Sequence, residues 1–359
     1  MAEPRRLERL SGQDLLMLWA DDFGWSEDIG VLGVLDGTRL LDRDGRVRVE
    51  EVRRRLAPRL ALVPRFRQLL YRPRWGLGRP LWVDAASFDI ADHVLVQPLG
   101  PPGGQAELLA ACARLGRRRL DPSRPLWELW LLPGLPGRRV GLFVRVHHTI
   151  ADGVAGVAAF GALLDPTPDA PLAAVAGGLR RLLAGRGEDP DGLVLRVMVP
   201  VSLHRERPGR ASGNQDSVML VPLPVGEPDP VRRLELIAAD TAARKRDLRP
   251  QIGGGLMGLA AVQRAWYRAL ARQRTVNLSV TNVPGPPAPR HLAGAPLLEL
   301  FPVVSLMGNL TLAVAVLSHA GQLNLTAVAD RHTCPDVEVF ARGVRDALDD
   351  LARQALVPS

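Results

Sequence analysis

Residues 139–153 read Arg-Val-Gly-Leu-Phe-Val-Arg-Val-His-His-Thr-Ile-Ala-Asp-Gly. Side chains alternate along this stretch, which predicts a strand over residues 139–148 with two distinct faces. One predicted face carries Val140, Leu142, Val144, Val146 and His148, and the other carries Gly141, Phe143, Arg145 and His147. A histidine at the end of an apolar row is desolvated, and desolvation favours the neutral imidazole that can accept a proton. The stretch therefore predicts a general base, His148, at the end of a buried strand.

Asp152 and Gly153 follow the two histidines at short spacing. A carboxylate in the first turn of the helix expected at residues 153–164 is favoured by the helix dipole, and a glycine permits a tight turn into that helix. Two adjacent histidines alone are more often a satisfied polar strand end, but Asp152 and Gly153 together with them favour a catalytic site. A metal site would need a third ligand, which this stretch does not supply, so no metal is expected.

The length of 359 residues predicts two domains. A run rich in proline and aspartate, residues 166–171, is the expected linker between residues 1–165 and residues 172–359. Helices are predicted at residues 50–62, 105–119, 153–164, 172–183, 231–246, 256–273 and 335–353. Strands are predicted at residues 125–132, 139–148, 193–203, 275–281 and 297–305, with a hairpin following them. Both halves therefore have mixed α/β content.

The basic charge does not predict a nucleic-acid partner. The net charge is +8, but the basic residues are almost all scattered arginines, which is typical of a compositional bias and otherwise suits anionic lipid or phosphate groups. No apolar run follows the first arginines, so a cytoplasmic protein is expected. Residues 300–329 lack formal charge, but prolines, glycines and asparagines favour a buried hairpin over a membrane span. Any membrane contact is expected to be peripheral.

Other catalytic motifs are absent or unsupported in the sequence. No G-x-S-x-G or P-loop pattern occurs. Gly253, Gly255 and Gly258 match G-x-G-x-x-G, but no buried strand precedes them, so dinucleotide binding is not expected. The two cysteines are far apart in sequence and imply neither a disulfide framework nor a zinc site, and Cys112 is expected to be a small buried apolar residue.

Residues 147–153 resemble the HHxxxDG motif of coenzyme-A-dependent acyltransferases and peptide-synthetase condensation domains. Further segments resemble the bacterial wax ester synthase/diacylglycerol acyltransferase family in particular. These segments are Leu10-Ser11-Gly12, Pro125-Leu126-Trp127-Glu128, residues 199–202, Gly213-Asn214, residues 281–286 and residues 328–331. Together they extend over most of the chain.

The resemblance implies an α/β (α+β) fold of two chloramphenicol-acetyltransferase-like domains, mixed sheets flanked by helices, that enclose a tunnel. It implies no cofactor, acyl-CoA as co-substrate, and diacylglycerol or a long-chain alcohol as acceptor. In the family pattern His148 deprotonates the acceptor, while His147, Asp152 and Gly153 complete the motif and Asp152 supports its geometry through a salt bridge. The implied substrate-binding residues are Pro125, Leu126, Trp127, Asn282, Pro284 and Gly285. Two structural alternatives stay open, a buried strand start around Trp127 and a rigid turn capped by Asn282.

The chain departs from the family pattern between its halves. Residues 164–168 lead almost directly into a helix that relatives reach after a long crossover, so the second domain is expected to be shortened. An active acyltransferase is the leading hypothesis, and a catalytically weak or inactive acyl-CoA- or lipid-binding protein is the alternative. A third is acyl transfer from a carrier-protein thioester. Missing elements would expose apolar surface, which favours a homodimer or a protein at membranes or lipid inclusions.

Overall fold

The computed structural model describes residues 8–10, 12–25, 28–73, 78–150, 170–202, 216–247, 268–269, 271–286 and 288–355. The strand predicted at residues 139–148 is β7 (Arg139–His147), which lies inside a six-stranded sheet. The sheet order is β11-β12-β2-β7-β6-β5. Its other members are β2 (Asp28–Asp36), β5 (Val94–Val96), β6 (Trp127–Leu135), β11 (His291–Leu292) and β12 (Ala295–Val303). Strands β2 and β6 pair with β7 in antiparallel register, so the motif strand is central.

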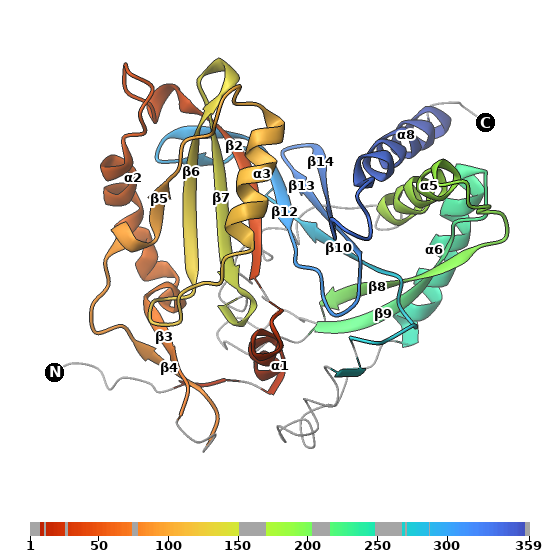
Figure 1. The fold of residues 1–359 in the computed structure, drawn as a ribbon, viewed down its shortest axis with the longest axis horizontal. Helices are drawn as coiled ribbons and strands as arrows, with labels where there is room; N and C mark the ends of the chain where they lie inside the picture. The colour runs from red at the N-terminus through yellow and green to blue at the C-terminus, as the bar shows by residue number, and fades with distance from the viewer. Residues whose placement is uncertain are drawn as a thin grey trace.

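Helices cover both faces of this sheet, which explains why neither face of β7 is exposed to solvent (Figure 1). Val140, Leu142 and Val146 belong to one apolar cluster with Val52 of α2 (Val49–Leu56). Phe143 belongs to a second cluster, with α3 (Gln105–Gly116). The predicted separation of these side chains onto two faces is confirmed. The helix predicted at residues 50–62 is α-helical only to Leu56 and continues as a 3-10 helix, Ala57–Leu62, because Pro58 lacks the amide that an α-helix requires.

The second half of the chain forms a five-stranded sheet in the order β14-β13-β10-β8-β9. Its strands are β8 (Val194–Ser202), β9 (Asp216–Pro224), β10 (Leu278–Pro284), β13 (Leu312–His319) and β14 (Gln322–Ala329). One face packs on α5 (Ala170–Gly185), α6 (Pro230–Asp247) and α8 (Val337–Ala355). The antiparallel pair β13–β14 confirms the hairpin predicted in the charge-free stretch. Among the described residues, no helix has both the length and the apolar character that crossing a membrane requires.

A strand from the second half of the chain, β12, connects the two sheets. Strand β12 pairs with β2 and so extends the first sheet, next to β13 and β14 of the second (Figure 1). The buried Asn324 side chain of β14 donates to the Leu300 carbonyl of β12 at 2.8 Å. Ser305 donates to the Asp28 carbonyl at 2.6 Å. Strand β12, from the second half of the chain, therefore belongs to the first sheet. The linker predicted at residues 166–171 lies outside the described residues except for its last two, and the domain boundary there stays a prediction.

The N-terminal segment lies against the end of the first sheet where β7 finishes (Figure 1). Helix α1 (Gly12–Ala20) is followed by a 3-10 turn, η1 (Asp21–Phe23), and a small sheet of β1 (Glu8–Arg9), β3 (Gln68–Tyr71) and β4 (Leu81–Asp84) lies beside it. Leu15 and Leu18 of α1 share an apolar cluster with Trp82 of β4 and Ile150. The first helix of the chain therefore contacts the residues that follow the histidine pair.

Candidate active site

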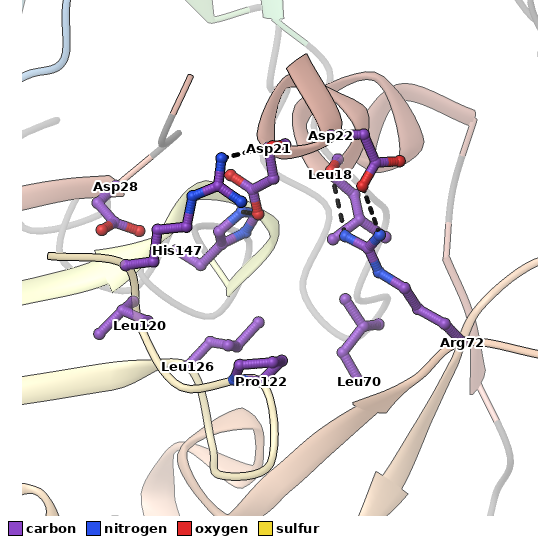
Figure 2. A pocket seen from close by; sticks show the side chains of 11 residues that line it. Leu18, Asp21, Asp22, Asp28, Leu70, Arg72, Leu120, Pro122, Leu126 and His147 are labelled. Carbon is purple, nitrogen blue, oxygen red and sulfur yellow. Dashed lines mark hydrogen bonds and ion pairs between the residues drawn. The ribbon is translucent and has the colours of Figure 1, made fainter. Parts of the chain in front are cut away.

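His147 is the last residue of β7, and its side chain is 3% exposed. Its Nδ1 lies 2.8 Å from Thr149 Oγ1 and 3.2 Å from the Thr149 amide nitrogen. Its Nε2 lies 3.0 Å from Asp21 Oδ2. Figure 2 shows the ring directed toward Asp21, which comes from the 3-10 turn after α1. Both ring nitrogens therefore have partners.

The Thr149 amide determines which nitrogen of His147 carries the proton. An amide N–H can only donate, so Nδ1 of His147 must accept and cannot itself be protonated. The ring proton then lies on Nε2, which donates it to the Asp21 carboxylate. The hydrogen-bond network therefore favours the tautomer of His147 with its proton on Nε2.

His148 begins a 3-10 turn, η8 (His148–Ile150), and is half-buried. The strand predicted through residue 148 thus ends one residue earlier, because the chain turns at His148 to bring Thr149 back onto the His147 ring. Ile150 is completely buried beneath α1. Asp152 and Gly153 lie outside the described residues, as does the helix predicted to follow them.

A buried ion cluster lies two residues before the histidine pair. The Arg145 guanidinium is 2% exposed and contacts Glu128 Oε2 of β6 at 2.9 Å and Asp28 Oδ2 of β2 at 3.4 Å. It also donates to the carbonyl oxygen of Arg118, in the loop after α3. Trp130 Nε1 donates to the same Glu128 oxygen at 2.8 Å. The cluster therefore joins β2, β6 and β7 at the end of the sheet that carries the histidines.

A cavity of about 550 Å³ opens on the His147 side of this turn. Its walls are apolar side chains and its polar groups are carboxylates and guanidiniums (Figure 2). The lining residues are Leu18, Asp21, Asp22, Asp28, Leu70, Arg72, Arg119, Leu120, Pro122, Leu126 and His147. Arg72 donates to Asp22 at 2.9 Å and to the Leu18 carbonyl at 3.3 Å. A volume in this range suits a small molecule or one alkyl chain.

The three predicted substrate-binding residues that precede the motif in sequence have different surroundings in the structure. Leu126 lines the cavity, whereas Pro125 and Trp127 are buried beside it. Trp127 is 3% exposed, donates to the Phe66 carbonyl at 2.9 Å and stacks between the Phe66 and His93 rings. This matches the structural alternative, a buried strand start. Contact of these residues with substrate stays a prediction.

The neighbouring His93 is buried in the same stack and titrates abnormally. Its Nδ1 donates to the Trp127 carbonyl at 2.8 Å, and its ring lies between those of Trp127 and Phe88. Burial lowers the pKa of His93 below its ordinary value, because the charged imidazolium loses its hydration in this stack. His93 is therefore a neutral structural residue at physiological pH.

Of the second-half residues predicted to bind substrate, Asn282 and Pro284 lie on a strand and Gly285 follows its end. Asn282 is inside β10, opposite Val316, so the expectation of a turn capped by Asn282 was wrong, because the apolar residues around it are paired on β13. Pro284 ends the strand. Gly285 is buried so tightly that an added Cβ would lie 2.2 Å from the Ser318 carbonyl. Neither Asn282 nor Gly285 is among the residues that line the cavity described above.

Sequence reasoning missed Asp21 and Asp28, which complete the polar side of the site. Asp28 pairs in register with His147, and this is visible only once β2 is known to be a strand. The apolar run Ile29–Leu35 between Asp28 and Asp36 was the available signal for that strand. Cys112 is buried as predicted, and burial raises its thiol pKa to about 12, so it is no nucleophile at neutral pH.

Comparison with known proteins agrees with the motif. Residues 10–182 match the wax ester synthase/diacylglycerol acyltransferase catalytic domain, and residues 212–352 match the C-terminal domain of the same family. The chain is 28% identical to the probable diacylglycerol O-acyltransferase tgs1 of Mycobacterium tuberculosis, in an alignment 396 positions long that covers 82% of this chain and 86% of that one. A second protein named as such an enzyme in that organism is 26% identical over 464 residues, covering 96% of this chain and 90% of that one.

Both alignments are longer than the 359 residues of this chain, so each of these relatives contains residues with no counterpart here. This agrees with a shortened chain, although the place of the missing residues stays a prediction. The fold resembles the wax ester synthase/diacylglycerol acyltransferase of Marinobacter aquaeolei, with a TM-score of 0.73 at 22% identity, over 98% of this chain and 100% of that one.

A condensation domain of rhizomide synthetase, solved with C8-CoA, has a TM-score of 0.61 at 14% identity, over 96% of this chain and 95% of that one. These likenesses confirm the predicted fold of two chloramphenicol-acetyltransferase-like domains with mixed sheets and flanking helices. The two domain matches, the relatives and the fold agree with the residues quoted from the sequence. The chain belongs to the wax ester synthase/diacylglycerol acyltransferase family.

Proposed function

We propose that this protein is an O-acyltransferase that moves a fatty acyl group from acyl-CoA to diacylglycerol or a long-chain alcohol, with His148 as general base. The observation that carries the proposal is the turn at the end of β7. His147 has both ring nitrogens engaged, so it could accept a proton only by giving up the Thr149 amide bond. His148 follows in the turn and is half-buried, and it is the member of the pair to which we assign proton transfer.

The proposed reaction needs no covalent enzyme intermediate. Neutral His148 removes the proton of the acceptor hydroxyl as its oxygen attacks the thioester carbonyl carbon. The carbon–sulfur bond then breaks, and the coenzyme A sulfur takes the proton from His148, so the base is regenerated. Asp152 and Gly153 complete the motif in this proposal, Asp152 by holding its geometry. The apolar wall of the cavity beside His147, which includes Leu126, supports an alkyl chain as part of the substrate, and His148 itself is not among the residues that line this cavity.

The test is ester formation from radiolabelled palmitoyl-CoA and either a long-chain alcohol or diacylglycerol, read on a thin-layer plate. His148→Ala should lower kcat about 100-fold or more, as loss of a general base does. His147→Ala should lower the melting temperature as well as activity, because the buried ring has three hydrogen bonds. If His148→Ala stayed folded with the activity of the wild type, the assignment of the base would be wrong.

A second candidate function is acyl-CoA or lipid binding with weak turnover. It is favoured because relatives contain residues that this chain lacks. A site with fewer walls admits water, and hydrolysis of acyl-CoA then competes with transfer. The ratio of free fatty acid to ester separates the two functions. Mostly ester supports the transferase, and binding of acyl-CoA with only fatty acid as product supports the second candidate.

The proposal includes contact with a membrane or lipid-inclusion surface, where such acceptors reside. One face of β8 and β9 packs on helices, while Val194, Val218 and Leu220 on the opposite face are 56%, 40% and 37% exposed. Exposed apolar side chains on one face favour lipid contact or self-association. Cosedimentation with vesicles supports the first, and a dimer mass by light scattering without vesicle binding supports the second.

A further inference from the structure

The N-terminal segment holds the histidine turn at two points. Before the turn, Asp21 accepts the Nε2 proton of His147 at 3.0 Å. After it, Ile150 is completely buried in a cluster with Leu15 and Leu18 of α1. His148 lies between these two contacts. Its position therefore depends on residues more than 120 positions earlier in the chain.

Asp21 is itself held on a fixed backbone. Its carbonyl oxygen accepts hydrogen bonds from the Gly24 amide at 3.0 Å and from the Arg119 guanidinium at 2.9 Å. Its side chain is 24% exposed at the cavity wall (Figure 2). The adjacent carboxylate, Asp22, instead pairs with Arg72. Of these two acidic residues, only Asp21 contacts the histidine pair.

The tautomer of His147 connects this carboxylate to the shape of the turn. With the proton on Nε2, Nδ1 can accept the Thr149 amide and close the turn. A proton on Nδ1 could be donated only to Thr149 Oγ1 at 2.8 Å, and the hydrogen bond from the Thr149 amide to Nδ1 would be lost. An acceptor at the position of Asp21 stabilises the first tautomer, because a buried N–H without a hydrogen-bond partner is destabilising. We infer that Asp21 is a positioning residue that sets the His147 tautomer and thereby the placement of His148.

This inference rests on the proposed function of His148. The tautomer of His147, however, can be measured without any enzymatic turnover. The ring nitrogens of ¹⁵N-labelled His147 have different shifts in the two tautomers, and Nε2–H is expected in the full-length wild type. A wild type with its proton on Nδ1 would overturn the inference directly. Because the wild type itself is measured, this arm does not depend on any variant folding.

The kinetic arm compares two substitutions at one position. Asp21→Ala removes the acceptor and should lower kcat by about tenfold to 100-fold, the effect of a small displacement of a catalytic group, with KM for acyl-CoA within twofold. Asp21→Asn keeps an oxygen that can accept the Nε2 proton, so this variant should retain most of the wild-type kcat and the Nε2–H signal. Asp350→Ala is the control, since Asp350 pairs with Arg353 at the surface of α8.

The results distinguish the inference from the proposed function. An Asp21→Ala protein that melts normally and keeps wild-type kcat would overturn the positioning role, and so would equal losses in the Ala and Asn variants, because charge and not hydrogen-bond acceptance would then matter. If the wild type forms no ester but Asp21→Ala alone loses the Nε2–H signal, the proposed function has failed and the tautomer control by Asp21 stands.

Discussion

Replacing Arg145 by methionine tests whether the buried ion cluster holds the site end of the first sheet together. The substitution keeps a long apolar stem, so little packing volume is lost. It removes the counter-ion of Asp28 and Glu128, whose side chains are only 7% and 16% exposed. Two carboxylates then remain in a poorly hydrated region without the compensating charge of Arg145.

The expected magnitude follows from this burial. Removing one partner of a buried ion pair is destabilising by about 3–5 kcal/mol, because the remaining charge stays buried and uncompensated. The matched control is Arg353→Met, which breaks a pair whose side chains are 72% and 38% exposed. An exposed pair contributes about 0–1 kcal/mol. The two substitutions are chemically identical, so the difference in unfolding free energy measures burial.

Urea unfolding followed by tryptophan fluorescence suits this comparison. Six of the seven tryptophans lie before residue 131, so the emission reports mainly on the first half of the chain. Arg145→Lys keeps the charge but loses the planar fork and should fall between wild type and Arg145→Met. If Arg145→Met lowered the unfolding free energy no more than Arg353→Met does, the buried cluster would not stabilise the sheet.

Two further predictions concern residues outside this cluster. Burial lowers the pKa of His93 in the folded protein, so the unfolded chain binds the extra proton first and stability should fall as pH drops below about 6.5. His93→Phe should flatten that dependence in melting temperatures measured from pH 7.5 to 5.5, and an unchanged slope would contradict the assignment. Gly285→Ala places a Cβ against the Ser318 carbonyl and should reduce the unfolding free energy by about 1–3 kcal/mol. Gly100→Ala, with open space at its Cβ, should change it by less than about 0.5 kcal/mol, and equal effects would contradict the packing argument.

Much of the fold could be predicted from local patterns. The helices predicted at residues 105–119, 172–183 and 231–246 are α3, α5 and α6 to within a few residues, because their apolar spacing and end signals are strong. The hairpin of β13 and β14 was predicted from one uninterrupted apolar stretch with a turn inside it. Strand β2 was missed, although it is the partner of both β7 and β12.

Pairing between distant segments could not be predicted. Strand β12 comes from the second half of the chain but extends the first sheet. This could not be predicted, because the apolar pattern of β12 is equally compatible with either sheet. Asn282 was expected on a turn because proline and glycine follow it, and pairing with β13 made it a strand residue. In both cases, neighbours far away in sequence decided between local conformations of similar energy.

The histidine pair, the strand that carries it and the family can be recognised from a short run of residue types and spacings. The surroundings of the pair depend on how distant segments of the chain pack. Asp21 reaches His147 because α1 packs across the end of the first sheet, and Arg145 meets Asp28 and Glu128 because three strands align in one register. Hydrogen bonds and ion pairs of this kind act over about 3 Å, and no sequence spacing specifies which distant side chains come that close.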